Sequence, residues 1–188
     1  MKRFSTKKLT LCAVLVAMAL GLSYFERFIP LQLLIPIPGV KLGLANIVTM
    51  LALYFLGTGA AFIILIVRCV MSSIFGGGIA GLMFSLTGGL LAMTVMALVK
   101  NMSRISVYGV SVCGAAAHVT GQIVAAMFIM RSFAVIGYLP LLLCTSVVTG
   151  FVTGVISSST FKALIASGQI PEFAKAHGEA EKNVGKNH

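Results

Sequence analysis

The sequence predicts an all-α integral membrane protein, a bundle of six transmembrane helices with both termini in the cytoplasm. Of the 188 residues, 59% are hydrophobic and 10% are charged, a composition typical of a membrane protein rather than of a soluble domain. The apolar residues form six runs that Pro, Gly and basic residues separate. Most Lys and Arg residues lie near the chain ends and in short connections, where they set the topology by the positive-inside rule.

The charge and cysteine patterns argue against several classes of protein. A formal net charge of +10 would indicate nucleic-acid binding in a soluble protein, but here the basic residues flank apolar runs, so we expect no nucleic acid as a partner. The cysteines lie singly in apolar runs, without Cys-x-x-Cys spacing or an adjacent His: Cys12, Cys69, Cys113 and Cys144. This spacing indicates neither a metal site nor a disulfide framework, and we expect no cofactor.

Residues 1–8 predict a basic cytoplasmic N-terminus, and the first helix is expected over residues 9–24. We expect this helix to be retained, because no clear signal-peptide cleavage site precedes a polar domain. Ala13, Ala17 and Gly21 recur at every fourth position and so form a stripe of small residues on one face of the helix. The stripe fits contact with a partner subunit and packing inside the bundle equally well.

The second apolar run, residues 43–56, follows a Pro- and Gly-rich outer loop that begins at Glu26 and ends with Lys41. Pro and Gly disfavour a regular helix in this loop, and Asn46 places an amide in the first turns of the second span. We expect Lys41 and Asn46 to line a pocket at the outer membrane face. In the alternative interpretation, Asn46 satisfies local backbone groups and Lys41 extends to lipid phosphates.

The third and fourth predicted spans cover residues 60–75 and 79–99, with a run of glycines between them. Arg68 lies about halfway along the third span, where an unpaired charge is costly, so its side chain must face protein, water or ligand. Ser85 adds a hydroxyl to the fourth span. Lys100 follows that span, which places the next connection in the cytoplasm.

The fifth predicted span, residues 107–130, carries His118 and Gln122 one turn apart on the same face and ends at Arg131. A single His without a carboxylate neighbour is a poor metal site. It fits either contact with a ligand or a hydrogen bond to a neighbouring helix. Helix direction places Arg68 at a depth comparable to His118 and Gln122, so these three side chains could meet.

Tyr138 begins the sixth predicted span, which ends near residue 165. The membrane domain is therefore expected over residues 9–166. Residues 167–188 are polar and hold three of the four acidic residues of the chain, a composition that predicts a mobile cytoplasmic tail.

Three segments together resemble a known family. They are residues 38–46, Pro-Gly-Val-Lys-Leu-Gly-Leu-Ala-Asn, residues 114–122, Gly-Ala-Ala-Ala-His-x-x-Gly-Gln, and residues 141–154. They resemble the Gx transporter family, which is also labelled heptaprenyl diphosphate synthase component I. That family looks like a branch of the substrate-binding S components of energy-coupling factor (ECF) vitamin transporters. The resemblance covers about residues 7–166.

The resemblance implies a fold of the ECF S-component type and a set of partners. In S components, an Ala-x-x-x-Ala pattern on the first helix docks on the transmembrane coupling subunit, and Ala13 and Ala17 stand in that place here. S components bind substrate near the outer face, through the first outer loop and the fourth to sixth helices. The chain has no ATP-binding motif, so active transport would need separate ATPase subunits.

The synthase label can be compared with the residues that such chemistry needs. Prenyl diphosphate synthesis uses carboxylate clusters that hold Mg²⁺ against diphosphate oxygens. The chain has no Asp, and its acidic residues are Glu26, Glu172, Glu179 and Glu181. We therefore expect the chain not to be an enzyme.

Two functions follow as hypotheses for a protein of the bacterial cytoplasmic membrane. The leading one is an S component that captures a small molecule at the outer face for ATP-driven uptake. The basic residues Lys41, Arg68 and Arg131 fit an anionic molecule, and they also fit contact with interface lipids or helix ends. The alternative is a non-catalytic membrane subunit that assists prenyl diphosphate or quinone metabolism. A self-contained proton-coupled carrier is least favoured, because Glu26 lies in a predicted loop. The expected substrate-binding residues are Lys41, Asn46, Arg68, Ser85, His118, Gln122, Arg131 and Tyr138.

Overall fold

The computed structural model describes residues 6–28, 41–102 and 105–166. Most of the predicted basic N-terminus, the proline-rich part of the outer loop and the predicted tail over residues 167–188 lie outside the described residues. Within the described ranges the chain is helical, and no strand is present.

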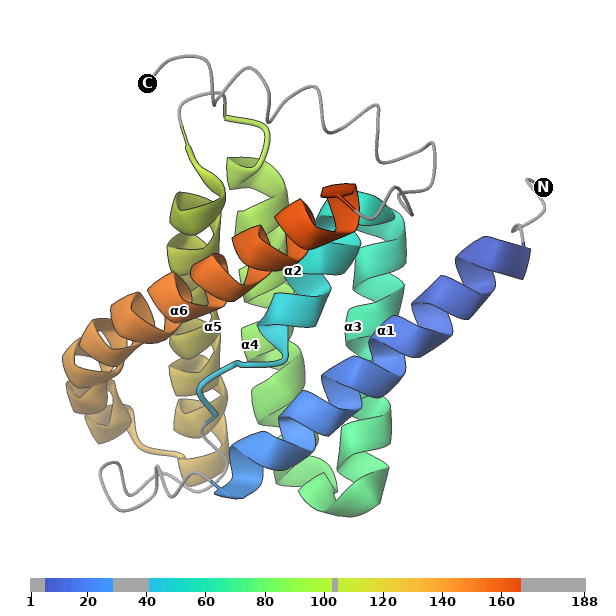
Figure 1. Ribbon diagram of the computed structural model, residues 1–188. Coiled ribbons are helices and arrows are strands. Elements are labelled where there is room, and N and C mark those ends of the chain that lie inside the picture. Colours follow the sequence, from blue (N-terminus) through green and yellow to red (C-terminus); the bar gives the residue numbers. More distant parts are fainter. Residues whose placement is uncertain (1–5, 29–40, 103–104, 167–188) are drawn as a thin grey trace.

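Six α-helices occur close to the six predicted runs. They are α1 (Thr6–Phe25), α2 (Asn46–Phe55), α3 (Thr58–Ser72), α4 (Gly78–Val99), α5 (Val107–Met130) and α6 (Leu139–Ala166). Short helical turns follow α1 at Glu26–Phe28, join α3 to α4 at Ser73–Gly77 and precede α6 at Phe133–Tyr138. Successive helices run in alternating directions, so that α1 begins and α6 ends at the same end of the bundle (Figure 1).

Within the described residues, four stretches are long and apolar enough to cross a membrane, which indicates a multi-pass membrane protein. They are Lys8–Phe25, Thr58–Val99, Val107–Met130 and Phe133–Ala163. The second stretch contains both α3 and α4, which lie antiparallel because the chain reverses at Gly76, where φ is 104°.

Helix α2 differs from the predicted full-length second span. Its 10 residues extend about 15 Å, roughly half of a 30 Å hydrocarbon layer. The helix starts late because Gly43 has φ 84°, a left-handed conformation that ends regular helix on that side. Seven of its residues are buried, so α2 is a short internal helix.

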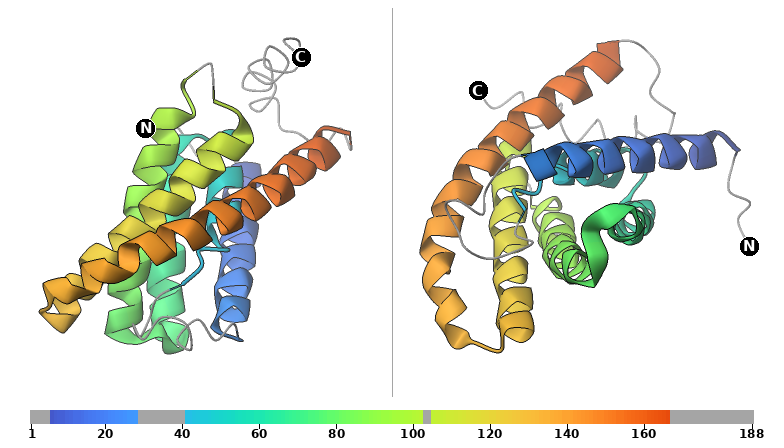
Figure 2. Two further views of the ribbon diagram at one scale, coloured as in Figure 1. Left: turned by 90° about the vertical axis from the view of Figure 1, so that its left-hand side faces the viewer. Right: turned by 90° about the horizontal axis from the view of Figure 1, so that it is seen from below.

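The helices pack as two groups around α2. Helix α5 lies between α4 and α6, whereas α1 packs on α2 and α3. Helix α6 crosses the bundle obliquely (Figure 2). A Cβ on Gly121 would lie 2.7 Å from the Thr87 carbonyl oxygen, and one on Gly150 would lie 2.8 Å from Val112 Cα. Glycine at these two positions therefore permits the close approach of α5 to α4 and of α6 to α5.

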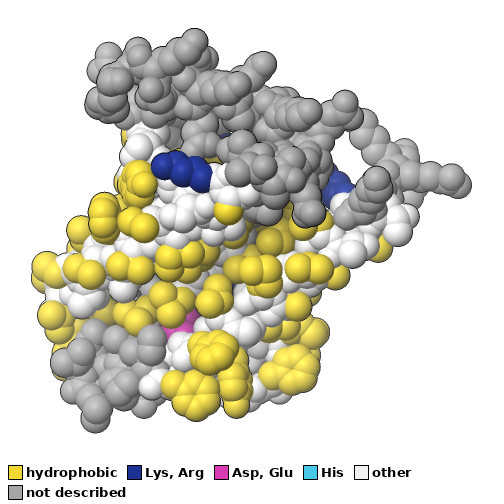
Figure 3. Space-filling model, in the orientation of Figure 1, with side chains coloured by type: hydrophobic (Ala, Val, Ile, Leu, Met, Phe, Trp, Pro, Cys, Tyr) yellow, Lys and Arg dark blue, Asp and Glu magenta, His cyan; other side chains and the backbone are white. Residues whose placement is uncertain are grey.

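The outward faces of the helices are apolar, as expected for contact with lipid. Large exposed side chains include Ile63 on α3, Phe128 on α5 and Val148 on α6. The face shown in Figure 3 is covered largely by hydrophobic side chains across α1 and α6. Polar side chains gather instead in the interior, around the segment that leads into α2.

Candidate functional site

A buried polar cluster surrounds residues 41–45, the segment that enters α2 from the end of the bundle opposite to the start of α1 (Figure 1). Gln122 is 0% exposed and Arg68 is 5% exposed. Polar groups at this depth are costly unless they are hydrogen-bonded or bind a ligand. The members of the cluster, brought together from six segments of the chain, are Glu26, Lys41, Asn46, Arg68, Ser85, His118 and Gln122.

Gln122 holds the backbone of Lys41 by two hydrogen bonds. The Lys41 N–H donates to Gln122 Oε1 at 3.2 Å, and Gln122 Nε2 donates to the Lys41 carbonyl at 3.1 Å. The carboxamide of Gln122 thereby pairs with an N–H and a C=O that stand side by side.

His118, one helical turn before Gln122, forms a hydrogen bond with the same carboxamide. Gln122 Nε2 lies 2.8 Å from His118 Nε2, which confirms that the two side chains share a face of α5. Because the Lys41 pairing makes Gln122 Nε2 a donor, His118 Nε2 accepts, and the ring proton is assigned to Nδ1. The Nδ1 side of the ring faces Gly88, where a Cβ would lie 2.9 Å away. His118 is therefore a neutral, tightly enclosed acceptor.

Arg68 joins the cluster through Asn46. Its Nη2 donates to Asn46 Oδ1 at 3.0 Å, and its buried Nε has no hydrogen-bond partner among the described residues. Asn46 is the first residue of α2, and its side-chain oxygen accepts from Arg68 of the neighbouring helix α3. The guanidinium keeps spare donor capacity in the interior of the bundle.

Lys41 points inward. Its Nζ donates to Ser85 Oγ of α4 at 2.7 Å, a contact inside the bundle rather than with lipid phosphates. The sequence left both directions open for Lys41, and in the structure its ammonium lies in the cluster.

Glu26 is the cluster member that the sequence analysis missed. It was expected in an outer loop, but it is 4% exposed and its carboxylate accepts a hydrogen bond from the Gly43 N–H. Burial raises the pKa of this carboxyl, against the opposing effects of the Gly43 N–H and of the charges on Lys41 and Arg68. One signal could have found it: Glu26 is the only acidic residue outside the C-terminal segment.

The cluster carries unbalanced charge. Its ionisable members other than His118 are two cations, Lys41 and Arg68, and one carboxylate, Glu26. With all three ionised, the cluster has a net charge of one positive unit in a low-dielectric interior, an arrangement that favours an anion.

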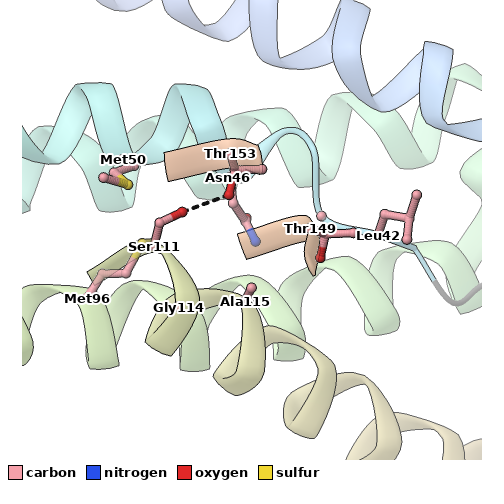
Figure 4. Close-up of a pocket in the computed structure, with 10 residues that line it drawn as sticks. Leu42, Asn46, Met50, Met96, Ser111, Gly114, Ala115, Thr149 and Thr153 are labelled. Carbon is pink, nitrogen blue, oxygen red and sulfur yellow. Dashed lines mark hydrogen bonds between the residues drawn. The ribbon is translucent and has the colours of Figure 1, made fainter. Parts of the chain in front are cut away.

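A small polar cavity adjoins the cluster. Ser111, Thr149 and Thr153 lie around Asn46 (Figure 4), and Ser111 Oγ is 2.7 Å from Thr153 Oγ1. The cavity measures about 10 Å³, close to the space that one water molecule needs. These three hydroxyls were not among the expected site residues, because Ser and Thr are common on ordinary helix interfaces.

Arg131 and Tyr138 stand apart from the cluster. Arg131 is exposed at the C-terminal end of α5, where it adopts φ 49°. Nine residues separate it from Gln122, about 14 Å along a helix. Tyr138 packs on an apolar group that includes Phe84 and Val119.

The small-residue stripe of α1 faces outward. Ala13, Ala17 and Gly21 are exposed, and a Cβ on Gly21 would have no atom within 4 Å. The opposite face of α1 is buried, with Leu15 and Ala19 in the core. The stripe is thus not used for packing within the described part of the bundle.

The comparison with family models decides the family. Residues 15–160 match the model described as heptaprenyl diphosphate synthase component I. The chain belongs to this component I family. The match contains all seven residues of the cluster. No curated protein and no solved structure matches the chain.

The component I family carries the name of a synthase, so metal-binding capacity is relevant. Within residues 6–28, 41–102 and 105–166, no three His, Cys, Asp or Glu side chains are grouped so that they could hold a metal ion. What the described site offers this family member is hydrogen bonding and positive charge.

Proposed function

We propose that this chain is the substrate-binding membrane subunit of a transporter of the energy-coupling factor type. It captures a small anionic molecule at the outer face of the cell membrane and works with a transmembrane coupling subunit and ATPase subunits. The observation that carries the proposal is the buried polar cluster around Lys41. Ionisable groups inside a membrane bundle are costly to bury and for that reason usually mark a ligand or ion site.

The arrangement of the helices supports the outward position of this site. With cytoplasmic termini, as proposed here, the alternating helices support an outer position for the 41–45 segment, because it enters the bundle from the end opposite to the start of α1 and the end of α6 (Figure 1). The basic residues near the chain ends favour this orientation by the positive-inside rule.

The exposed stripe of α1 supports the partner. Small side chains let a second helix approach closely and gain van der Waals contact along its length. Ala13, Ala17 and Gly21 lie on the outward face of α1, so a coupling subunit has direct access to them.

Purification of the protein in lipid nanodiscs tests the proposal. We expect the chain to co-purify with a coupling module when both are expressed, and mass spectrometry to detect a retained small anion. A stable, monodisperse preparation that never associates with a coupling module would contradict the transport role.

A second candidate function rests on the family description. The chain could be a non-catalytic membrane subunit that assists prenyl diphosphate synthesis or quinone metabolism. It holds no Asp and only one acidic residue before residue 172, so the Mg²⁺-binding carboxylates would come from another subunit. Restored synthesis of long-chain prenyl diphosphate, when the chain is added to a soluble synthase, would favour this function over transport.

A further inference from the structure

The chain's own backbone occupies the centre of the polar cluster. Residues 41–43 lie between Gln122 and the hydroxyl-lined cavity, which Leu42 and Gly43 help to enclose. A Cβ on Gly43 would be 2.9 Å from Asn46 Nδ2 and 3.0 Å from His118 Cδ2. Because only about 10 Å³ remains free in that cavity, a ligand larger than water that binds at this cluster needs the space that the segment now fills.

The hydrogen bonds of that segment indicate which polar groups a ligand must carry to bind in its place. The carboxamide of Gln122 donates to a C=O and accepts from an N–H of the same residue, Lys41. Its second N–H is held by His118, which fixes the donor and acceptor ends of the amide. A group that replaces the Lys41 backbone must offer the same pair, because an unpaired buried amide is costly.

The charge of the cluster indicates a second requirement for the ligand, namely a negatively charged group. Arg68 has a buried Nε without a partner among the described residues, and the other N–H groups of its guanidinium share the same positive charge. A carboxylate or phosphate would bind these donors with charge-assisted hydrogen bonds.

We propose that the ligand is an anion that also carries an N–H beside a C=O, as cyclic amides and ureides do. The N–H and C=O pair with Gln122 in place of the Lys41 backbone, and the anionic group pairs with Arg68. This inference names the substrate class of the proposed transporter subunit and rests on that proposed function.

Three probes of similar ring size separate the two requirements. Orotate carries N–H and C=O groups and a carboxylate, uracil lacks the carboxylate, and benzoate lacks the N–H and C=O pair. We expect orotate to bind the protein in nanodiscs, at millimolar concentration in equilibrium dialysis, about tenfold tighter than either other probe. Equal binding of orotate and benzoate overturns the amide requirement, and equal binding of orotate and uracil overturns the anion requirement. No binding of orotate overturns the proposal.

Two variants test whether Gln122 recognises the N–H and C=O pair and whether Arg68 recognises the anionic group. Gln122→Glu replaces the donor end of the amide by an acceptor, so the preference for orotate over benzoate should vanish. Arg68→Gln should abolish the preference for orotate over uracil. Thr160→Val serves as the control, because its hydroxyl bonds only Ile156 of its own helix. If a variant fails to fold, Gln122→Met and Arg68→Met repeat the measurement. Unchanged preferences in folded variants overturn the assignment.

The retained molecule separates this inference from the transport proposal. A chain that co-purifies with a coupling module but retains an anion without an N–H and C=O pair overturns the inference alone. A chain that selects orotate but never joins a coupling module overturns the transport role and leaves the recognition chemistry standing.

Discussion

Two residues of the cluster region, Glu26 and Gly43, occupy positions where a favourable contact comes with an energetic cost. Glu26 neutralises part of the charge of Lys41 and Arg68, yet burial disfavours its own ionised form. Gly43 lets the chain pass between Asn46 and His118, where any Cβ would collide. Substitutions at these two positions therefore test the cluster with few changes elsewhere.

Glu26 should make the stability of the protein depend on pH. Its pKa is raised in the folded state, mainly by burial, so its contribution to stability is fully present below the unfolded pKa and is lost as pH rises through the folded pKa. We expect Glu26→Gln to remove this loss. The melting temperature of both proteins is measured from pH values below the unfolded pKa of Glu26 to values above its folded pKa. If the melting temperatures of the two proteins change in parallel with pH, the burial of the carboxyl is contradicted.

Gly43→Ala should destabilise the protein more than Gly57→Ala. Both glycines have positive φ, 84° and 85°, so each substitution should cost about 1 kcal/mol in backbone conformation. Only the Cβ at position 43 meets neighbours within 4 Å, whereas position 57 is open. Denaturant unfolding of the two variants separates the steric cost, and equal losses would show that the segment can shift aside.

At the scale of elements, the short helix α2 is held at its C-terminal end. Phe161 of α6 packs against Tyr54 and Phe55, with ring centroids 5.1 and 5.0 Å apart. Lys100 Nζ donates to the Leu53 carbonyl at 2.9 Å, which satisfies a group at the helix C-terminus. These contacts hold α2 so that Asn46, at its other end, reaches Arg68.

Phe161→Ala should release this anchor. The side chain is 3% exposed, and its loss should cost up to about 3 kcal/mol, the low end for a buried Phe because lipid rather than water surrounds the bundle. Phe128→Ala is the control, since Phe128 is 73% exposed on α5. We expect a lower melting temperature for the first variant only; similar values for both would indicate that the aromatic contact adds little.

For the whole molecule, the outward stripe of α1 predicts separate effects on assembly and on stability. Ala17→Leu adds bulk to an exposed position, so the fold and ligand binding should persist while association with a coupling module weakens at least tenfold, about 1.4 kcal/mol. Co-purification yield and melting temperature are the two readouts.

Two matched substitutions test that separation. Ala80→Leu makes the same change at an exposed position of α4 and should affect neither readout. Ala19→Leu places it at a 0% exposed position of α1 and should lower stability directly by overpacking. A fall in stability for Ala17→Leu as large as for Ala19→Leu would show that the stripe packs within the bundle.

The sequence by itself determined those features that depend on local periodicity and composition. Long apolar runs predicted the membrane helices within a few residues, because backbone groups in lipid must be satisfied within a helix. The spacing of His118 and Gln122 predicted that they share a face, because residues four apart lie on the same side of a helix. Arg68 was expected to face protein, water or ligand, since an isolated charge is not tolerated at that depth.

Only the tertiary structure decided how distant segments meet. Lys41 and Gln122 are 81 positions apart and pair only because the chain folds. Glycines likewise let α5 approach α4, and α6 approach α5, across long stretches of sequence. Glu26 is buried because the chain after α1 folds back onto Gly43, a path that no local pattern encodes. Arg68 reaches the cluster through Asn46 rather than through His118. The physical reason is that side-chain partners across a bundle are chosen by helix packing, whereas the helices themselves are chosen by local sequence.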